Sequence, residues 1–302
     1  MEKQKQQSVD TLQGGPCFPW VGGKRRLLPT LTESLPEDFG QMKTYVEPFV
    51  GGGALFFWIR QNYPQIHCVI NDSNEHLINV YRTIREQPRQ LIGLLYEIQE
   101  FYQGLAGYAE RKEYFLEQRA NYNDGNPTNL VRAALFMFFM RACYNAIYSV
   151  NKSGKLSLTF GNYKRTNMLD SELIWANSQL LKDVEILDGD YMQTQKFASK
   201  QSFFYFDPPY KPVNEANSCT SYMPQNFDDP EQIRLAGFCK ELDSQEVKWM
   251  LSNSDPRQKN PENSFFDDLY GDYRIRRLSI FRPICSVAAK RKNVNELLIT
   301  NY

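Results

Sequence analysis

Four consecutive residues that follow an apolar run have the side chains needed to bind a planar, polar molecule: Asp207, Pro208, Pro209 and Tyr210. Residues 202–206, SFFYF, are typical of a buried strand. Two successive prolines cannot donate hydrogen bonds to a sheet, so the strand must end there. The loop therefore presents a carboxylate, rigidly held carbonyl groups and an aromatic ring at the carboxyl end of a strand, where open α/β sheets bind ligands.

This combination fits one demanding reaction, attack by the exocyclic amine of adenine. The amine is a poor nucleophile because its lone pair is delocalised into the ring. Acceptors for both amine hydrogens favour a tetrahedral nitrogen, and the Asp207 carboxylate and the Pro208 carbonyl are the candidate acceptors. Tyr210 can stack on the base, which must first be flipped out of a duplex. The competing interpretation is a structural turn at the end of a strand.

A second motif, EPFVGGGA at residues 47–54, lies between an expected strand at 44–49 and an expected helix. Glycine there allows a tight turn and close approach of a ligand. Glu47 and the apolar start of the helix suit a nucleoside with positive charge better than a pyrophosphate. The next expected strand, 67–72, ends in Asp72, which is placed like an acid that binds ribose hydroxyls. A purely structural glycine turn is the alternative.

The remaining pattern predicts how these motifs are positioned. A strand, a glycine turn, a helix and a second strand open a parallel α/β sheet. Residues 88–142 have helical periodicity, and residues 145–163 read as a β-hairpin around KSGK. Further strands are expected at 184–187, 202–206, 247–252, 272–281 and 295–302. The prediction is one α/β domain with a mainly helical insert.

The charges are unevenly distributed. The chain has 35 basic and 35 acidic residues, hence a formal net charge of zero, which taken alone argues against a nucleic-acid-binding protein. Residues 125–169, however, contain six basic residues and no acid, and aromatic residues are interleaved with them. Such a stretch suits phosphate contacts and base stacking, with ordinary solvated charges as the alternative.

The cysteines and histidines indicate no metal site. No pair among the six Cys has CxxC spacing, and the two His have no partners at zinc-ligand spacing. The polar first 15 residues lack the apolar region of a secretory signal, and the longest apolar run is too short to cross a membrane. A cytoplasmic protein with reduced thiols and no membrane partner is expected.

Five motifs in the same order resemble a Dam-type DNA adenine-N6 methyltransferase of the alpha group: WVGGK (20–24), EPFVGGGA (47–54), ND (71–72), DPPY (207–210) and LSNS (251–254). The resemblance implies an S-adenosylmethionine-dependent, Rossmann-like catalytic domain with an inserted target-recognition domain that is mainly helical and carries the β-hairpin. It assigns residues 1–79 and 170–302 to the catalytic domain and residues 80–169 to the target-recognition domain.

The resemblance also implies roles for single residues. Asp207 to Tyr210 match the catalytic loop. The residues matching cofactor-binding positions are Trp20, Gly23, Lys24, Glu47, Pro48, Phe49, Gly51, Gly53, Asp72 and Asp207. Asp190 is a looser match, and the alternative is an ordinary solvated acid at the surface.

DNA contacts are expected in the hairpin and in a loop before the last strand. The candidates are Tyr144, Asn145, Ser149, Lys152, Lys155, Lys164, Arg165, Lys290, Arg291 and Lys292. The family's hairpin carries an arginine that helps to read guanine in GATC, and Ser149 stands at that position. Because a bidentate guanine contact is unavailable to serine, GATC is a doubtful site for this chain, although Lys152 could supply a substitute contact.

The expected function is methyl transfer from S-adenosylmethionine to N6 of a flipped adenine in a short duplex DNA motif. The expected partners are double-stranded DNA and a separate cognate restriction endonuclease, and the expected state is a monomer. Two alternatives remain open. One is a methyltransferase of RNA or of protein glutamine, which more often carries an Asn-Pro-Pro-Tyr loop. The other is a DNA-binding protein that has lost catalysis.

Overall fold

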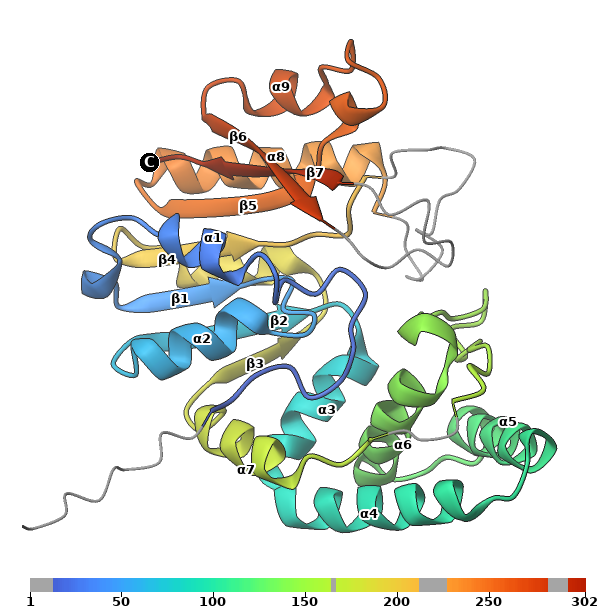
Figure 1. Ribbon diagram of the computed structural model, residues 1–302. Coiled ribbons are helices and arrows are strands. Elements are labelled where there is room, and N and C mark those ends of the chain that lie inside the picture. Colours follow the sequence, from blue (N-terminus) through green and yellow to red (C-terminus); the bar gives the residue numbers. More distant parts are fainter. Residues whose placement is uncertain (1–12, 164–166, 212–226, 282–292) are drawn as a thin grey trace, which may run out of the picture.

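The computed structural model describes residues 13–163, 167–211, 227–281 and 293–302. A seven-stranded sheet has the strand order β3-β2-β1-β4-β5-β7-β6 (Figure 1). Its strands are β1 (Thr44–Glu47), β2 (His67–Asp72), β3 (Glu185–Asp188), β4 (Ser202–Phe206), β5 (Lys248–Ser254), β6 (Arg274–Phe281) and β7 (Asn293–Thr300). The first five are parallel, whereas β7 runs antiparallel to both β5 and β6.

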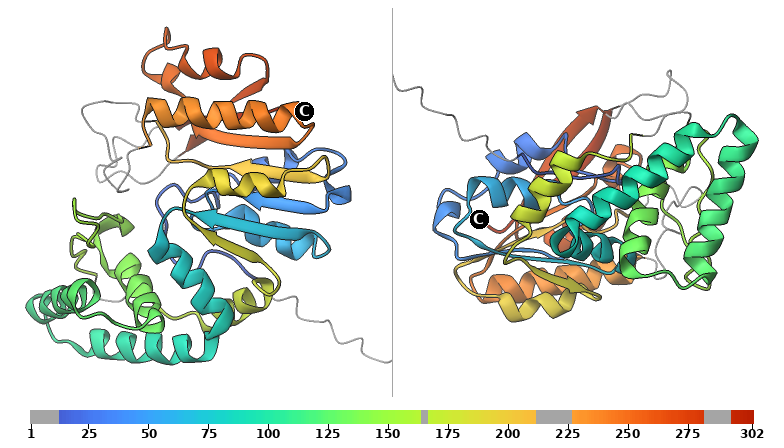
Figure 2. Two further views of the ribbon diagram at one scale, coloured as in Figure 1. Left: turned by 180° about the vertical axis from the view of Figure 1, so that it is seen from behind. Right: turned by 90° about the horizontal axis from the view of Figure 1, so that it is seen from below.

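Both faces of the sheet are buried by helices. Alternate residues of one strand enter different cores: Tyr45 packs on one face and Val46 on the other. This two-sided burial explains why the strands are continuously apolar. Figures 1 and 2 show α2 and α8 on opposite faces. The helices are α1 (Leu28–Glu33), α2 (Ala54–Asn62), α3 (Glu75–Glu86), α4 (Pro88–Gly104), α5 (Tyr108–Asp124), α6 (Asn129–Ala142), α7 (Ser171–Leu180), α8 (Asp229–Ser244) and α9 (Phe265–Tyr270).

Helices α4, α5 and α6 form an insert between the second and third strands (Figure 1). Helix α6 is apolar around its circumference because it packs against α3, α4 and α5. The expected domain boundary at residue 80 falls inside α3, a continuous helix that also contacts α7 and β3. Helix α3 therefore connects the insert to the sheet.

The expected hairpin at 145–163 is only partly regular. It forms two isolated antiparallel bridges, Val150–Leu156 and Cys143–Phe160, instead of a continuous ladder. Asn145 and Ala146 both have positive φ angles, of 51° and 54°. Since two left-handed residues reverse the chain sharply, regular pairing cannot extend through them.

The expected strands 67–72 and 202–206 match β2 and β4 residue for residue, and the other expected strands agree with the structure to within a few residues. No helix in the described ranges is both long and apolar enough to cross a membrane.

Candidate active site

The loop of residues 207–211 leaves β4 at the edge of the sheet where the parallel strands end. Its backbone is held by polar side chains of neighbouring elements. The carbonyl of Pro209 accepts a hydrogen bond from Gln232 Nε2 at 3.1 Å. The N–H of Lys211 donates to Asn253 Oδ1 at 3.3 Å, and its carbonyl accepts from Ser254 Oγ at 2.7 Å. Helix α8 and strand β5 thus fix the shape of this loop.

Lys24 connects the N-terminal motif to this loop. Its ammonium lies 2.7 Å from Asp207 Oδ1 and 4.5 Å from the centre of the Tyr210 ring. It also donates to the carbonyl of Gly22 at 2.8 Å. The Lys24 side chain is only 5% exposed and that of Asp207 19%, so the pair is largely shielded from water. The structure therefore brings Lys24 to the expected catalytic residues.

The ring of Tyr210 is fixed at its other end by Glu296 of β7. The hydroxyl of Tyr210 donates to Glu296 Oε2 at 2.7 Å, and Glu296 is 2% exposed. Burial, together with the nearby Asp207 and Glu296 carboxylates, raises the pKa of Tyr210 well above its usual value. Tyr210 is thus a neutral aromatic surface with a fixed orientation.

The glycine turn after β1 is closely covered. Gly51 and Gly53 have positive φ angles, of 47° and 68°. The indole of Trp20 lies over the turn, where a Cβ on Gly51 would be 3.1 Å from Trp20 Nε1. A Cβ on Gly53 would be 2.5 Å from the hydroxyl of Tyr81, which donates to the Gly51 carbonyl at 2.9 Å. Both the conformation and the space at Gly53 require glycine.

Asp72 connects this turn to the start of α3. Its Oδ2 accepts from the N–H of Gly51 at 3.0 Å and its Oδ1 from the N–H of Asn74 at 3.0 Å. Asn74 in turn caps α3, since its side chain accepts from the N–H groups of His76 and Leu77. Burial raises the pKa of Asp72 to about 6, against the lowering effect of the backbone donors. The carboxylate is therefore held rigidly at the carboxyl end of β2.

Glu47 is a second buried acid at the carboxyl end of β1. It is 2% exposed, and its Oε2 accepts from Tyr45 Oη at 2.6 Å. Burial raises the pKa of Glu47 well above its usual value, and the charge of Asp207 adds to this effect, while Tyr45 and Lys24 oppose it. A cation that enters next to Glu47 would favour its ionised form.

Of the other expected cofactor residues, Gly23 closes a turn by donating to the Trp20 carbonyl at 3.1 Å, and the Pro48 carbonyl accepts from Asn71 Nδ2 at 3.0 Å. The Phe49 ring packs against Tyr191, with ring centres 5.1 Å apart. Asp190 forms an ion pair with Arg234 at 2.8 Å and caps the following 3-10 turn through the N–H of Met192. These bonds give Asp190 a structural role at the carboxyl end of β3.

The expected DNA-contacting residues of the irregular hairpin lie on its surface. Tyr144 is 47% exposed, and the N–H of the adjacent Asn145 donates to Tyr163 Oη at 3.2 Å. Ser149 donates to the Ser157 carbonyl across the hairpin. The hydroxyl at the position where the family has arginine is thus engaged within the protein.

The basic residues of the insert differ in their partners. Lys155 pairs with Asp124 at 2.5 Å, and Arg141 donates to the Cys17 carbonyl at 2.9 Å. Among the described residues of the insert, Lys152 is exposed and has no ion-pair or hydrogen-bond partner for its ammonium. Five other expected DNA contacts lie outside the described residues: Lys164, Arg165, Lys290, Arg291 and Lys292.

A cavity of about 390 Å³ separates the insert from the ends of β2 and β3. Its walls include Ser73 and Gly189 from the sheet and Tyr148 from the insert. Trp20 bridges the same two parts, with its ring 5.9 Å from that of Tyr148. The cavity therefore adjoins Asp72 and opens between the motifs that the sequence predicts to bind cofactor and DNA.

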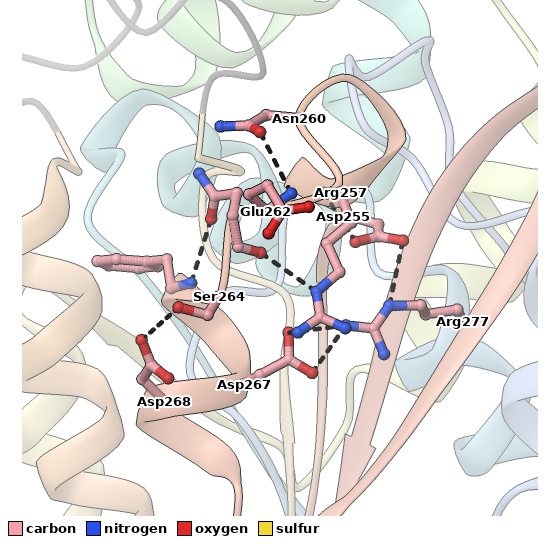
Figure 3. Close-up of polar contacts among 10 residues, drawn as sticks. Asp255, Arg257, Asn260, Glu262, Ser264, Asp267, Asp268 and Arg277 are labelled. Carbon is pink, nitrogen blue, oxygen red and sulfur yellow. Dashed lines mark hydrogen bonds and ion pairs between the residues drawn. The ribbon is translucent and has the colours of Figure 1, made fainter.

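The carboxyl end of β5 is anchored by an ion cluster (Figure 3). Arg277 of β6 lies 3.4 Å from Asp255 Oδ2 and 2.7 Å from Asp267 Oδ2, and Arg257 lies 3.1 Å from the same Asp267 oxygen. Asp255 is 2% exposed and follows Ser254 directly. The cluster thus fixes the end of the strand that holds the 207–211 loop.

Four residues that support this loop have no role predicted from the sequence: Gln232, Asn253, Ser254 and Glu296. Two of them, Asn253 and Ser254, belong to the LSNS motif, and polar residues that end an apolar strand are a detectable signal. Gln232 and Glu296 have no comparable signal, because their importance comes from contacts between elements distant in sequence.

The fold and the site together define a class of protein. A parallel sheet of this order with an antiparallel β7, and with a DPPY loop after β4, is consistent with an S-adenosylmethionine-dependent methyltransferase. Residues 20–284 match the family of D12 class N6 adenine-specific DNA methyltransferases. The chain belongs to this family, whose members methylate adenine in DNA and use S-adenosylmethionine as the methyl donor.

Individual relatives agree with this assignment. The chain is 38% identical to the Type II methyltransferase M.MjaIII of Methanocaldococcus jannaschii over 95% of this chain and 99% of that protein. It is 36% identical to the Type II methyltransferase M1.LlaDCHI of Lactococcus lactis subsp. cremoris over 95% of each chain. It is 25% identical to the DNA adenine methylase of Haemophilus influenzae over 99% of this chain and 97% of that protein.

Proposed function

We propose that the loop of Asp207 to Tyr210 is the catalytic centre of this adenine methyltransferase. The observation that carries the proposal is the convergence of a carboxylate, an ammonium and a fixed aromatic ring on one loop at the end of β4. Asp207 and the Pro208 carbonyl would accept the two amine hydrogens of a flipped adenine, and Tyr210 would stack on the base. Asp207 would also accept the proton that the methylated amine must lose.

The residues around the glycine turn fit S-adenosylmethionine chemically. The rigid Asp72 carboxylate suits the two ribose hydroxyls, and the cavity beside Ser73 and Gly189 leaves room for a nucleoside. The acidic Glu47 suits a ligand that bears positive charge. When bound, the cofactor supplies an electrophilic methyl group. Trp20, Gly23, Pro48, Phe49, Gly51 and Gly53 would shape its binding loop, while Asp190 would act by orienting the end of β3.

Lys24 would act mainly by holding the catalytic loop in place and less by contacting the cofactor. Its ammonium balances the charge of Asp207 and lies over the ring of Tyr210, so it holds the two groups in one arrangement. The shielding of this pair from water strengthens the attraction. Lys24 is thus a second residue on which activity should depend.

We propose residues 80–169 as the target-recognition domain and residues 1–79 with 170–302 as the catalytic domain. The exposed Tyr144 and Asn145 would probe the gap left by the flipped base. Lys152 would contact DNA, and Lys155, Lys164 and Arg165 would add to the positive surface, as would Lys290, Arg291 and Lys292. Ser149 is engaged within the hairpin. This supports a recognition sequence in which that position makes no bidentate guanine contact.

The finer biological setting is also a proposal. Two relatives are named as Type II methyltransferases, which supports a cognate restriction endonuclease that acts separately. A monomer suffices to methylate one strand per encounter, and a cytoplasmic location gives access to bacterial or archaeal DNA.

The test of the proposed adenine methylation is expression in a host without adenine methylation, followed by sequencing that detects modified bases. N6-methyladenine at one short motif is expected, and uniformly unmethylated DNA from cells that contain folded protein would refute the proposal.

A further inference from the structure

Gln232 of α8 joins two elements that hold the 207–211 loop. Its amide nitrogen donates to the Pro209 carbonyl at 3.1 Å, and its amide oxygen accepts from Asn253 Nδ2 at 3.1 Å. Asn253 uses its own oxygen to accept from the N–H of Lys211 at 3.3 Å. The two amides therefore form a continuous bridge from the loop through α8 to β5 and back to the loop.

Burial of the two amides favours one arrangement of this bridge. Gln232 is 1% exposed and Asn253 is fully buried. A buried amide that loses its partner remains desolvated. The arrangement in which every hydrogen bond is made is therefore strongly preferred over arrangements in which one is broken. The ion pair between Lys211 and Asp229 ties the start of α8 to the same loop. Helix α8 is thus held in a fixed position relative to the two prolines.

The direction of the Pro209 carbonyl controls the direction of the Pro208 carbonyl. The planes of the two successive peptide groups are related by the φ and ψ angles of Pro209. The proline ring locks φ near −65°, so ψ is the main remaining freedom. A hydrogen bond that fixes the Pro209 carbonyl therefore also limits where the Pro208 carbonyl can point.

We propose that Gln232 is a positioning residue that, together with Asn253, aims the Pro208 carbonyl at the amine of the flipped adenine. This inference rests on the proposed role of the Asp207 to Tyr210 loop. Because Gln232 acts through the loop carbonyls that face the amine and does not contact the glycine turn, its loss should slow methyl transfer and leave cofactor binding intact.

The test compares Gln232→Met, which keeps the shape and removes both hydrogen bonds, with Gln232→Glu, which presents an acceptor to the Pro209 carbonyl. Transfer of labelled methyl groups from S-adenosylmethionine to unmethylated plasmid DNA gives kcat and the KM for the cofactor. Each rate is divided by the concentration of cofactor-binding sites measured by calorimetry, so that unfolded protein does not lower the apparent kcat. We expect kcat to fall at least about tenfold in Gln232→Met and further in Gln232→Glu, at a KM within about twofold of the wild type.

Asn301→Leu is the matched control. Asn301 makes a similar amide bridge at the opposite end of β5, where it accepts from the N–H of Trp249 and donates to Asp243 and the Val247 carbonyl. The kcat of Asn301→Leu per cofactor-binding site should equal that of the wild type. An unchanged kcat in Gln232→Met, or an equal loss in Asn301→Leu, would overturn the positioning role alone. An inactive wild-type enzyme would overturn the proposed function and this inference with it.

Discussion

Lys24, near the start of the chain, and Asp207, at the end of β4, form an ion pair in which Lys24 Nζ lies 2.7 Å from Asp207 Oδ1. The two residues are 183 positions apart (207 − 24) in the sequence. The pair joins the N-terminal motif to the proposed catalytic loop, and the same ammonium lies over the ring of Tyr210. One cation thus organises both of the side chains that are proposed to hold the adenine.

The first prediction concerns this pair. Lys24→Met keeps the aliphatic stem and removes the charge, so Asp207 and Tyr210 lose their common partner. We expect kcat to fall roughly tenfold to a hundredfold, which is less than the roughly hundredfold to thousandfold loss for a donor that contacts the reacting group directly. Lys200→Met, at an exposed lysine that pairs with Glu246, is the control and should keep full activity. Equal activities of the two variants would show that the Lys24 ion pair has no catalytic value.

The second prediction is a pH dependence of cofactor binding. Burial raises the pKa of Asp72 to about 6. Above that pH the carboxylate is ionised and can accept the ribose hydroxyls; below it, protonation removes an acceptor. The affinity for S-adenosylmethionine should therefore fall as the pH drops through about 6. Calorimetric titration of the wild type and of Asp72→Asn separates this effect from the cofactor's own titration. A decline that persists unchanged in Asp72→Asn would assign it to another group.

The third prediction concerns the glycine turn. Gly53→Ala would strain a backbone with a φ of 68° and would bring its Cβ to 2.5 Å from the Tyr81 hydroxyl. We expect a loss of about 1–3 kcal/mol in the free energy of unfolding. Gly237 lies inside α8, where an added Cβ would have no atom within 4 Å. Gly237→Ala should therefore stabilise the folded protein by about 0.5–1 kcal/mol. Urea unfolding measures both; a neutral Gly53→Ala would mean that the turn relaxes freely.

The fourth prediction concerns the insert. Lys152→Ala should weaken DNA binding and reduce the slope of log affinity against log salt by about 1, as expected for the loss of one phosphate contact. Lys182→Ala, just before the amino end of β3, should change neither quantity. Fluorescence anisotropy with a duplex at several salt concentrations reads out both variants. An unchanged slope for Lys152→Ala would place the DNA elsewhere on the protein.

The fold could be predicted largely from local sequence. Apolar runs such as residues 202–206 give strands that are buried on both faces, and the prolines at 208 and 209 mark the end of β4 without knowledge of the rest of the chain. The glycines at 51 and 53 mark the turn in the same way. These features are local consequences of backbone chemistry, which is why their positions agree with the structure.

The contacts that support the site could not be predicted in this way. Gln232 is one polar residue in an amphipathic helix, and Glu296 is one acid in the last strand. Each acquires its partner, Pro209 or Tyr210, only when the sheet brings α8 and β7 beside the loop. The hairpin shows the same limit, since positive φ angles at Asn145 and Ala146 interrupt the strand pairing of the β-hairpin that the residue pattern predicts.

Methyl transfer by Asp207→Ala tests the central claim most directly. Wild-type and variant protein are incubated with unmethylated duplex DNA and S-adenosylmethionine carrying a labelled methyl group, and the DNA is digested to nucleosides. We predict labelled N6-methyl-2′-deoxyadenosine from the wild type and none from Asp207→Ala, while calorimetry shows that the variant still binds the cofactor. Labelled N6-methyl-2′-deoxyadenosine from Asp207→Ala at the wild-type rate would contradict the proposed catalytic role of Asp207.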